Sequence, residues 1–264
     1  MLLHESPYGP QYYCFDNLSR FSGLVHGVFT RNGGSSKNNF KSLNVGLSTG
    51  DNKESVYLNR RAIAKTMGID EKQSVYLNQV HGKEFLLLKD VYNTKANNAK
   101  YQQYQYAADG IVSNIKEVLT VMQVADCQAI ILYDPENKVI ANLHSGWRGS
   151  ILNIAGRGVE IMMENFGTNP SKIIAAVAPS LGPCCAEFKN YRDEIPEEFW
   201  KYRIDVHEYH FDFWQMSRDQ LTEKGVLPQN IEVSRVCTPC TSHLFYSYRK
   251  EKITGRFAVA VGLI

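Results

Sequence analysis

The sequence of 264 residues lacks both a large excess of charge and a long hydrophobic run. Lysine and arginine total 29 against 27 aspartate and glutamate residues, and no basic block is longer than a few residues. This balance gives no reason to expect binding to nucleic acid or to an anionic membrane surface. No apolar stretch approaches the roughly 20 residues that a membrane-spanning helix needs. We therefore expect a globular protein with neither nucleic acid nor a membrane as partner.

The first residues, MLLHESPYGPQYYCFDN, also lack the charged start and apolar middle of a secretory signal peptide. The six cysteines are then expected to be reduced thiols in a cytoplasmic protein, not a disulfide framework. Cys237-x-x-Cys240 and the adjacent Cys184 and Cys185 raise the idea of a structural zinc site. A Cys-x-x-Cys pair normally needs a second ligand pair, however, and neighbouring cysteines point apart on a strand. We therefore expect buried or redox-inert thiols at these positions.

The pattern of apolar residues along the chain predicts both strands and helices. Val118–Val124 and Lys138–Leu143 are short and rich in β-branched residues, which predicts strands. Lys53–Met67 carries apolar residues on one helical face, with Asp51 as the expected N-cap. Further helices are expected over Ile151–Phe166 and Phe211–Lys224. Strands outnumber helices and no repeat or change of composition divides the chain, so we predict one mixed α/β domain over residues 1–264.

One stretch breaks this regularity. Residues Val91–Tyr106, with the sequence VYNTKANNAKYQQYQY, are polar, rich in asparagine, glutamine and tyrosine, and without periodicity. A segment of this length and composition has too few apolar residues to form part of a core. We predict an excursion on the surface instead of a linker between two domains.

Three distant residues have the chemistry of a metal site. His81, Cys127 and His144 each follow an apolar run beside glycine or another small residue, although their spacing matches no short metal-binding motif. Two imidazoles and a thiolate are ligands that zinc prefers, and three protein ligands leave a fourth position for water, whose pKa falls to about 7. Copper is the alternative ion, because the same ligands bind Cu²⁺.

The same residues also allow chemistry without a metal. Cys127 would then be a thiolate nucleophile and His144 its base, with Asp126 or Asp109 orienting the imidazole. The structural alternative is that the cysteine is a small core residue and each histidine is simply hydrogen-bonded. Spacing alone does not separate these three interpretations.

Arginines near turns are candidates for binding an anion. Arg148 follows Trp147 at an expected turn from strand to helix, where a guanidinium and helix N–H groups could hold a phosphate. Arg249 and Arg256, at the last turn of the chain, raise the same question with less support. The Gly33-Gly34 loop could present backbone N–H groups to an anion, although most such loops are only turns.

Several sequence blocks, taken together, resemble one known family. They are FTRNGGSS, SLNVGLSTGD followed by NRR, NQVHG, AADGIVS, VADC, HSGWRG, APSLGPCC and CT…FYSYRK…TGR. They run in order from about Phe29 to the C-terminus, and they are similar to the YfiH-type purine nucleoside phosphorylases, also described as laccase-domain or multicopper polyphenol oxidoreductases. A single block would be weak evidence, whereas so many ordered matches are highly specific.

The resemblance implies a layered α/β/β/α fold and a catalytic zinc ion held by the residues that match the family's ligands, His81, Cys127 and His144. It implies phosphorolysis of adenosine, inosine, guanosine and methylthioadenosine, and deamination of adenosine. The partners would be a purine nucleoside and phosphate, and the protein would be a monomer or a weak homo-oligomer. The alternatives are a copper-dependent phenol oxidase and a metal-binding or interaction module without turnover.

This interpretation assigns roles to further side chains. We expect Asn44 and Gln79 to hydrogen-bond ribose or base, Arg60 and Arg148 to hold phosphate, and Asp126 or Asp109 to carry a proton, since the H-x-E motif of zinc deaminases is absent. Cys127 would be catalytic through the ion. An oxidase with several coppers would need histidine-rich clusters, and the seven histidines are spread singly.

Two positions depart from the family blocks. HSGWRG stands where HAGWRG is usual, so the Ser145 hydroxyl could lie near the metal. CCAEF places Ala186 where a tyrosine normally follows the paired cysteines, which could open a pocket wall or remove a contact.

Overall fold

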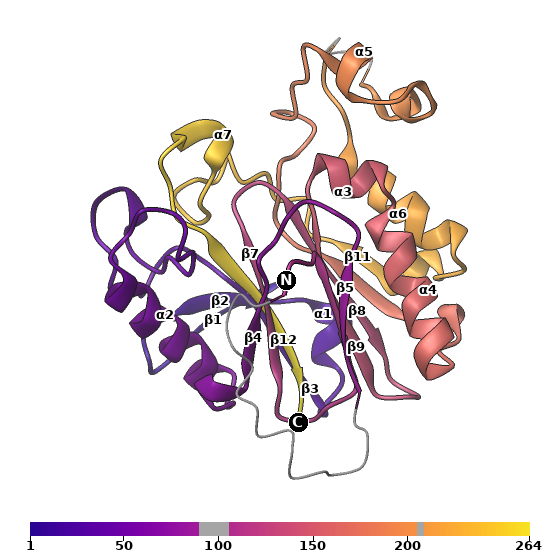
Figure 1. The fold of residues 1–264 in the computed structure, drawn as a ribbon. Helices are drawn as coiled ribbons and strands as arrows, with labels where there is room; N and C mark the ends of the chain where they lie inside the picture. The colour runs from indigo at the N-terminus through magenta and orange to yellow at the C-terminus, as the bar shows by residue number, and fades with distance from the viewer. Residues whose placement is uncertain (90–105, 205–208) are drawn as a thin grey trace.

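The structure, a computed structural model, describes residues 1–89, 106–204 and 209–264. Figure 1 shows two β-sheets that face each other, with helices on their outer sides. α2 (Lys53–Thr66) covers one sheet, while α4 (Ile154–Phe166) and α6 (Phe213–Glu223) cover the other. The predicted mixed α/β class with α/β/β/α layers is confirmed. The predicted excursion at 91–106 lies, apart from its last residue, outside the described residues.

In the first sheet, the last strand of the chain lies between two earlier ones. The strand order is β1 (Leu2–Glu5), β2 (Gln11–Cys14), β3 (Leu24–Phe29), β12 (Phe257–Leu263), β7 (Leu119–Val124) and β4 (Ser74–Tyr76). β12 is antiparallel to β7 with Phe257 opposite Val124, and β4 is parallel to β7. The end of β7, the end of β4 and the start of β12 therefore lie together at one edge of this sheet.

The second sheet contains the central hairpin of the sequence. Its strand order is β11 (Ile231–Val233), β10 (Ile174–Val177), β8 (Gln128–Asp134), β9 (Val139–Ser145), β6 (Gly110–Ser113) and β5 (Phe85–Leu88). Gln128 pairs with Ser145, and Gly110 pairs with Leu143. The start of β8, the end of β9 and the start of β6 are therefore neighbours, and His144 lies within β9 instead of following it.

Both faces of the central strands are buried, and alternate residues serve different layers. In β8, Ile131 and Tyr133 pack between the two sheets, whereas Ile130 and Leu132 pack against the helical layer that contains α4. In β12, the larger residues face the other sheet and the two alanines face α2. Side chains alternate between the faces of a strand, so a run that is apolar at every position fits a sheet buried on both sides.

The helix boundaries differ from the predictions at their caps. The N-cap of α2 is Asn52, whose side chain accepts a hydrogen bond from the Ser55 N–H, instead of Asp51. The helix predicted over Ile151–Phe166 begins three residues later, as α4, and a separate short helix, α3 (Trp147–Ile151), precedes it. Asn153 separates them in the left-handed region, with φ of 56°, and caps α4 through the Gly156 N–H. Local side-chain hydrogen bonds decide these positions, which apolar periodicity does not report.

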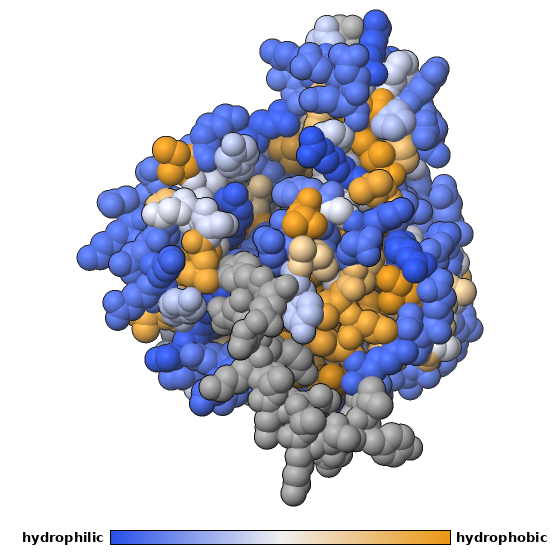
Figure 2. Space-filling view, in the orientation of Figure 1, coloured by the Kyte–Doolittle hydropathy of each residue, from blue (hydrophilic) through white to orange (hydrophobic). Residues whose placement is uncertain are grey.

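The remaining helical elements are short. They are α1 (Asp16–Ser19), α5 (Tyr191–Glu194), α7 (Tyr248–Glu251) and the 3₁₀ turns Asn38–Phe40, Glu71–Gln73, Pro170–Lys172, Glu197–Tyr202 and Pro228–Asn230. α5 and its surroundings extend above the sheets in Figure 1 around a small apolar cluster that includes Phe188 and Phe211. In the view of Figure 2, hydrophilic side chains cover the outer helices, and hydrophobic ones gather around β5. No helix in the described ranges is long and apolar enough to cross a membrane.

A buried histidine in β3 gives the fold an expected acid sensitivity. His26 is only 5% exposed, and its Nε2 accepts a hydrogen bond from the Phe15 N–H at 2.8 Å. Burial lowers the pKa of His26 to about 4 from an ordinary value of 6.5. Between these pH values the unfolded chain binds a proton that the folded protein does not, so stability falls as the pH falls. The loss from this residue should reach about 3 kcal/mol.

Urea unfolding of wild type and His26→Gln at pH 7.5 and pH 4.5 checks this. Glutamine keeps an acceptor but cannot be protonated, so the variant should lose about 2 to 3 kcal/mol less than wild type on acidification. His243→Gln is the matched control, because His243 is exposed and its replacement should leave the acid-dependent loss unchanged. Equal losses in wild type and His26→Gln would contradict the assignment.

Candidate metal centre

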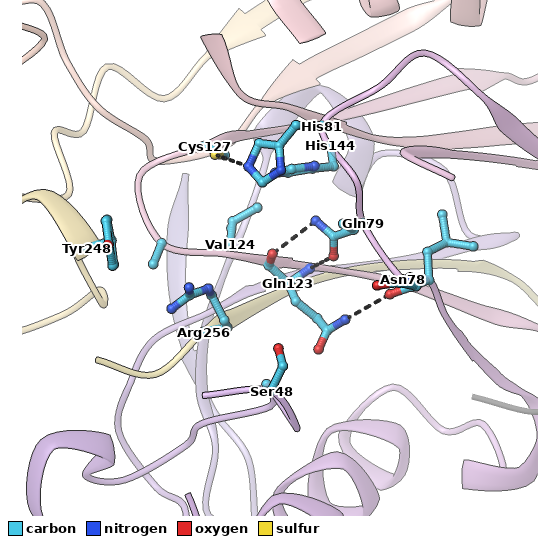
Figure 3. Close-up of a pocket in the computed structure, with 13 residues that line it drawn as sticks. Ser48, Asn78, Gln79, His81, Gln123, Val124, Cys127, His144, Tyr248 and Arg256 are labelled. Atoms are coloured by element: carbon cyan, nitrogen blue, oxygen red, sulfur yellow. Dashed lines mark hydrogen bonds between the residues drawn. The ribbon is translucent and has the colours of Figure 1, made fainter. Parts of the chain in front are cut away.

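The three predicted ligands meet where the two sheets come together. His81 lies in the loop after β4, Cys127 in the connection from β7 to β8, and His144 near the end of β9. Cys127 Sγ lies 3.8 Å from His81 Nε2, and the two imidazole rings have centroids 4.7 Å apart in an edge-to-face arrangement. The ligand atoms of all three residues lie within 4.8 Å of one another (Figure 3). The three residues, which are separated by 46 (127 − 81) and 17 (144 − 127) positions in the sequence, thus lie at one site.

These donors fit a single metal ion. Zinc lies about 2.3 Å from a thiolate sulfur and about 2.0 Å from an imidazole nitrogen, so two ligands of one tetrahedral ion lie roughly 3.5 Å apart. The observed separation of the Cys127 and His81 donor atoms is close to this value. His81 is exposed whereas His144 is buried, which leaves one side of the centre open to solvent. The donor set accepts zinc or copper, and geometry alone does not distinguish them.

Asp109 holds two of the three ligands in place. Its buried carboxylate lies 2.7 Å from His144 Nδ1 and accepts hydrogen bonds from the backbone N–H groups of Val80, His81 and Gly82. The bond to Nδ1 leaves Nε2 of His144 as the nitrogen that could bind a metal ion, and the backbone bonds support the left-handed conformation of His81, with φ of 59°. Burial alone would raise the pKa of Asp109, but the bonds from His144 and Gly82 outweigh it and lower that pKa.

The Cys127 thiol and the buried His144 imidazole shift each other's pKa toward their charged forms. Burial opposes charge on both groups, but each charged form stabilises the other. The attraction of His144 and His81 lowers the pKa of Cys127 to about 6, and Cys127 with Asp109 raises the pKa of His144 to about 9. The thiolate is the form that binds a metal ion, and ion binding would release the imidazolium proton. The same pair could serve a cysteine nucleophile, but His81 as a second imidazole at the sulfur favours the metal site.

Gly146 leaves the space that the ligands occupy. A Cβ atom at this position would lie 2.8 Å from His81 Cδ2 and 3.1 Å from Cys127 Sγ. Any side chain here would displace two of the three ligands. The first glycine of the HSGWRG block is therefore required by the site itself.

Replacing Asp109 by asparagine should weaken the centre without removing a ligand. Because an outer carboxylate orients the imidazole and increases its basicity, the affinity for Zn²⁺ should fall about 10- to 100-fold. Competition with a chromophoric chelator measures this change. Asp134→Asn is the matched control, because Asp134 is equally buried but holds the turn at the other end of the β8–β9 hairpin through Glu136 and Asn137. Equal affinities in wild type and Asp109→Asn would contradict the positioning role.

A polar cavity of about 470 Å³ opens beside the three ligands. Its wall includes the side chains of Ser48, Asn78, Gln79, Gln123, Tyr248 and Arg256. No carboxylate belongs to this lining among the described residues, whereas a guanidinium and two imidazoles do. The cavity is therefore suited to an anionic or strongly polar ligand.

Arg256 is the main site residue that the sequence interpretation undervalued. It immediately precedes β12, whose first residue lies opposite the end of β7, so strand register brings it to the cavity. Its Nη1 donates to the carbonyls of Thr254 and Gly255, which orients the guanidinium. Burial lowers its pKa, against the opposing attraction of Cys127 and Asp126. Its place before the last apolar strand was the available signal.

The other residues predicted to bind substrate make their hydrogen bonds within the protein. Gln79 lines the cavity, but both ends of its amide bond the backbone of Gln123 (Figure 3). Asn44 is fully buried, with its amide bonded to Gly46, Thr49, Asp51 and Arg256. Arg60 is also buried, and lies over the Tyr76 ring while donating to Val45 and to Gln123. Asn44 and Arg60 therefore support cavity residues and are not part of the lining.

The predicted phosphate and proton carriers also lie apart from this cavity. Arg148 is exposed, with its guanidinium over the ring of its neighbour Trp147, and it lines neither this cavity nor the smaller one that adjoins it. Asp126 lines the smaller adjoining cavity, and its carboxylate accepts bonds from the Thr238 hydroxyl and the Arg249 N–H, so it ties two loops together. In the glycine loop, the Gly34 N–H donates to Ser42 and is already used.

A second cavity, of about 250 Å³, adjoins the first. Both are lined by Cys127 and Tyr248, and the second adds the aromatic rings of Trp147, Phe188 and Phe213. The Ser145 hydroxyl bonds Ser150 and belongs to this second lining. Ala186 is fully buried in the outlying apolar cluster and lines neither of these two cavities, so it does not open the wall of either one.

The fold and the site together define a class, namely α/β/β/α sandwiches with a His–Cys–His cluster where the sheets meet. Residues 25–264 match the family model described as multi-copper polyphenol oxidoreductase laccase. The chain belongs to this family, which confirms the resemblance drawn from its sequence blocks.

Relatives of known name cover nearly the whole chain. It is 32% identical over 252 residues to the purine nucleoside phosphorylase YlmD of Geobacillus stearothermophilus, covering 92% of this chain and 91% of that protein. It is 30% identical over 244 residues to the purine nucleoside phosphorylase YfiH of Escherichia coli, covering 89% and 92%. The crystal structure of YlmD from Geobacillus stearothermophilus has a TM-score of 0.83 at 30% identity, covering 99% of this chain and 98% of that one. The hypothetical protein YfiH of Bacillus licheniformis has a TM-score of 0.85 at 27% identity, covering 99% of both chains.

Proposed function

We propose that the protein is a zinc-dependent purine nucleoside phosphorylase. The observation that carries this proposal is the convergence of His81, Cys127 and His144 on the wall of a polar cavity that contains Arg256 and, in its described lining, no carboxylate. The names of the relatives support a phosphorylase over an oxidase. When bound, the ion would supply Lewis acidity, which stabilises negative charge that develops on the reacting groups.

Phosphate would bind at Arg256. A guanidinium is always charged and offers five N–H donors in a planar fork, which matches two oxygens of a phosphate. The carbonyl bonds of Nη1 restrict how this fork is oriented in the cavity. In phosphorolysis a phosphate oxygen forms a bond to C1′ as the bond from C1′ to N9 breaks. The electron pair passes to the purine, which takes up a proton.

The nucleoside would extend over both cavities. Trp147, Phe188 and Phe213 form an apolar wall suited to a purine ring, while the amide-lined cavity suits ribose and phosphate. Cys127 and Tyr248 lie on the boundary between the two cavities. This arrangement would place the glycosidic bond near the metal ligands. Gln79 and Gln123 would hold the polar wall rigid through their mutual hydrogen bonds.

The proposed substrates of phosphorolysis are adenosine, inosine, guanosine and methylthioadenosine. The second proposed reaction is deamination of adenosine at C6. Deamination needs an activated water, and the open side of the centre beside exposed His81 would admit it. Asp126 is already bonded to Thr238 and Arg249, and Asp109 to His144. We therefore assign neither carboxylate as the proton carrier.

The direct test is product analysis with the zinc-loaded protein and adenosine. Adenine and ribose 1-phosphate should form only when phosphate is present, whereas inosine should form with or without phosphate. His81→Ala, assayed in parallel, separates turnover at this site from contamination. Absence of adenine from the phosphate-containing reaction would overturn the phosphorylase proposal, and absence of inosine would overturn the deaminase part.

The rival function is copper-dependent phenol oxidation, which the description of the family model suggests. In the described ranges, a single His-containing cluster offers a metal site, whereas an oxidase with several coppers needs more. Oxidation of a phenol by the copper-loaded protein, together with inert nucleosides, would favour the rival.

A further inference from the structure

Four cysteines form a second cluster away from the cavities. Cys184 and Cys185 follow β10, and Cys237 and Cys240 follow β11. Cys240 Sγ lies 3.6 Å from the sulfur of Cys184 and 3.6 Å from that of Cys185. The four sulfur atoms lie within 4.8 Å of one another, and all are free thiols. The expectation that neighbouring Cys184 and Cys185 would point apart is wrong, because they lie in a turn and not on a strand.

The fold brings the two pairs together through strand pairing. β10 and β11 are parallel neighbours, and the pairing continues past their ends, where Ser180 bridges Cys237. The chain then turns back at Gly182, whose carbonyl accepts the Cys185 N–H. Parallel strands end at the same edge of a sheet, so residues that follow each strand become neighbours. The second ligand pair, Cys184 and Cys185, which the sequence interpretation considered and set aside, is brought to the first by this register.

We propose that Cys184, Cys185, Cys237 and Cys240 bind one tetrahedral zinc ion. With a zinc to sulfur distance of about 2.3 Å, the sulfur atoms of a tetrahedral site lie roughly 3.8 Å apart. The observed separations match one ion, whereas a cluster of several irons would hold its thiolates farther apart. A disulfide would need two sulfur atoms at about 2.05 Å, whereas all four cysteines are free thiols here.

The surroundings suit a thiolate site. The Lys250 ammonium donates to the Pro239 carbonyl and the Ser242 hydroxyl, which places a positive charge beside the Cys237–Cys240 turn. Four thiolates and one Zn²⁺ carry a net negative charge, which this cation offsets. Gly182 allows the two loops to approach, because a Cβ there would lie 2.9 Å from the Cβ of Cys237. None of the four cysteines lines either described cavity, so the ion is structural and not catalytic.

Such an ion would anchor the loops beside the metal centre. Thr238, inside the Cys237–Cys240 turn, donates its hydroxyl to Asp126 at 2.7 Å, and Asp126 is adjacent to Cys127. Asp126 also accepts the N–H of Arg249, in the helix that carries the cavity residue Tyr248. The ion would thus hold in place loops that contact the residues of the cavity wall.

Metal content tests the proposal. Purified wild type, saturated with Zn²⁺ and freed of excess, should hold two ions per chain, and Cys184→Ser/Cys240→Ser should hold one. The double variant should melt on the order of 10 °C lower because it loses the stabilisation by the ion. Cys14→Ser is the matched control, because Cys14 is a half-buried thiol outside both clusters and should leave two ions bound. His81→Ala should lose the other ion and keep this one.

A measurement on the unaltered protein guards against a variant that fails to fold. Addition of Zn²⁺ to the apo protein should protect Cys184 and Cys240, both exposed, from a thiol-alkylating reagent, and Co²⁺ should give the absorption of tetrahedral thiolate coordination. Unprotected thiols at saturating Zn²⁺, iron in place of zinc, or a mass decrease showing a disulfide would overturn the proposal. These results are independent of nucleoside turnover, so they stand apart from the proposed enzymatic activity.

Discussion

Replacing His81, Cys127 or His144 by alanine, one at a time, is expected to lower phosphorolysis by at least about 10³-fold. Each variant loses one of three ligands, and the Lewis acidity at stake amounts to several kcal/mol of transition-state stabilisation. Zn²⁺ at the centre should be lost together with the activity. Metal analysis of each variant, paired with steady-state kinetics on adenosine and phosphate, measures both effects.

The variants at His81 and Cys127 should still fold, because these two residues lie in loops beyond the strand ends and not in the core of a sheet. His81 is exposed and Cys127 half-buried, so their truncation removes little apolar packing. His144 is buried and paired with Asp109, so its alanine variant should also be less stable, since the Asp109 charge loses its partner. Cys14→Ala and His243→Ala, outside the centre, serve as controls and should retain metal and turnover. Full activity in any ligand variant would remove that residue from the site.

Arg256→Ala is expected to weaken the use of phosphate about 10²-fold, seen as a lower kcat/KM for phosphate. Apart from the imidazoles, the guanidinium is the cationic group in the described wall of the cavity. Removal of one such donor group typically lowers the rate roughly 10²- to 10³-fold. Arg256→Lys keeps the charge but not the planar fork, so it should recover only part of the loss. Kinetics with varied phosphate at saturating nucleoside measure this.

Arg148→Ala is the matched control for Arg256→Ala. Arg148 is exposed and lies outside both cavities, so its replacement should leave kcat/KM for phosphate within about twofold of wild type. Deamination of adenosine, which uses no phosphate, should be affected less than phosphorolysis by Arg256→Ala. A large effect at Arg148 with none at Arg256 would place the phosphate elsewhere.

The proximity of the three candidate ligands could be predicted from sequence because its signals are local. His81, Cys127 and His144 lie at the ends of apolar runs, and loops gather at strand ends. Their residue types then restrict the chemistry to that of a soft metal ion or a thiolate nucleophile. The family blocks point to the same three residues, and in the structure their potential ligand atoms lie within 4.8 Å of one another.

The roles of the arginines were harder to predict from sequence, because an arginine near a turn has the same local sequence whether it faces a cavity or solvent. Arg60 and Arg148 were the predicted phosphate ligands, yet one is buried against Tyr76 and the other is exposed. Arg256 reaches the cavity because the last strand of the chain inserts beside β7. That pairing is a long-range choice of the fold, which no local pattern encodes.

The sequence by itself determined the mixed α/β class, the positions of most central strands and helices, and the three candidate ligands. These follow from apolar periodicity and side-chain chemistry, which act over a few residues. Tertiary structure alone decided that Asp109 orients His144, that Arg256 enters the cavity, and that four cysteines from two loops converge. Each of these depends on the register and order of strands far apart in the chain, and packing of the two sheets sets that register.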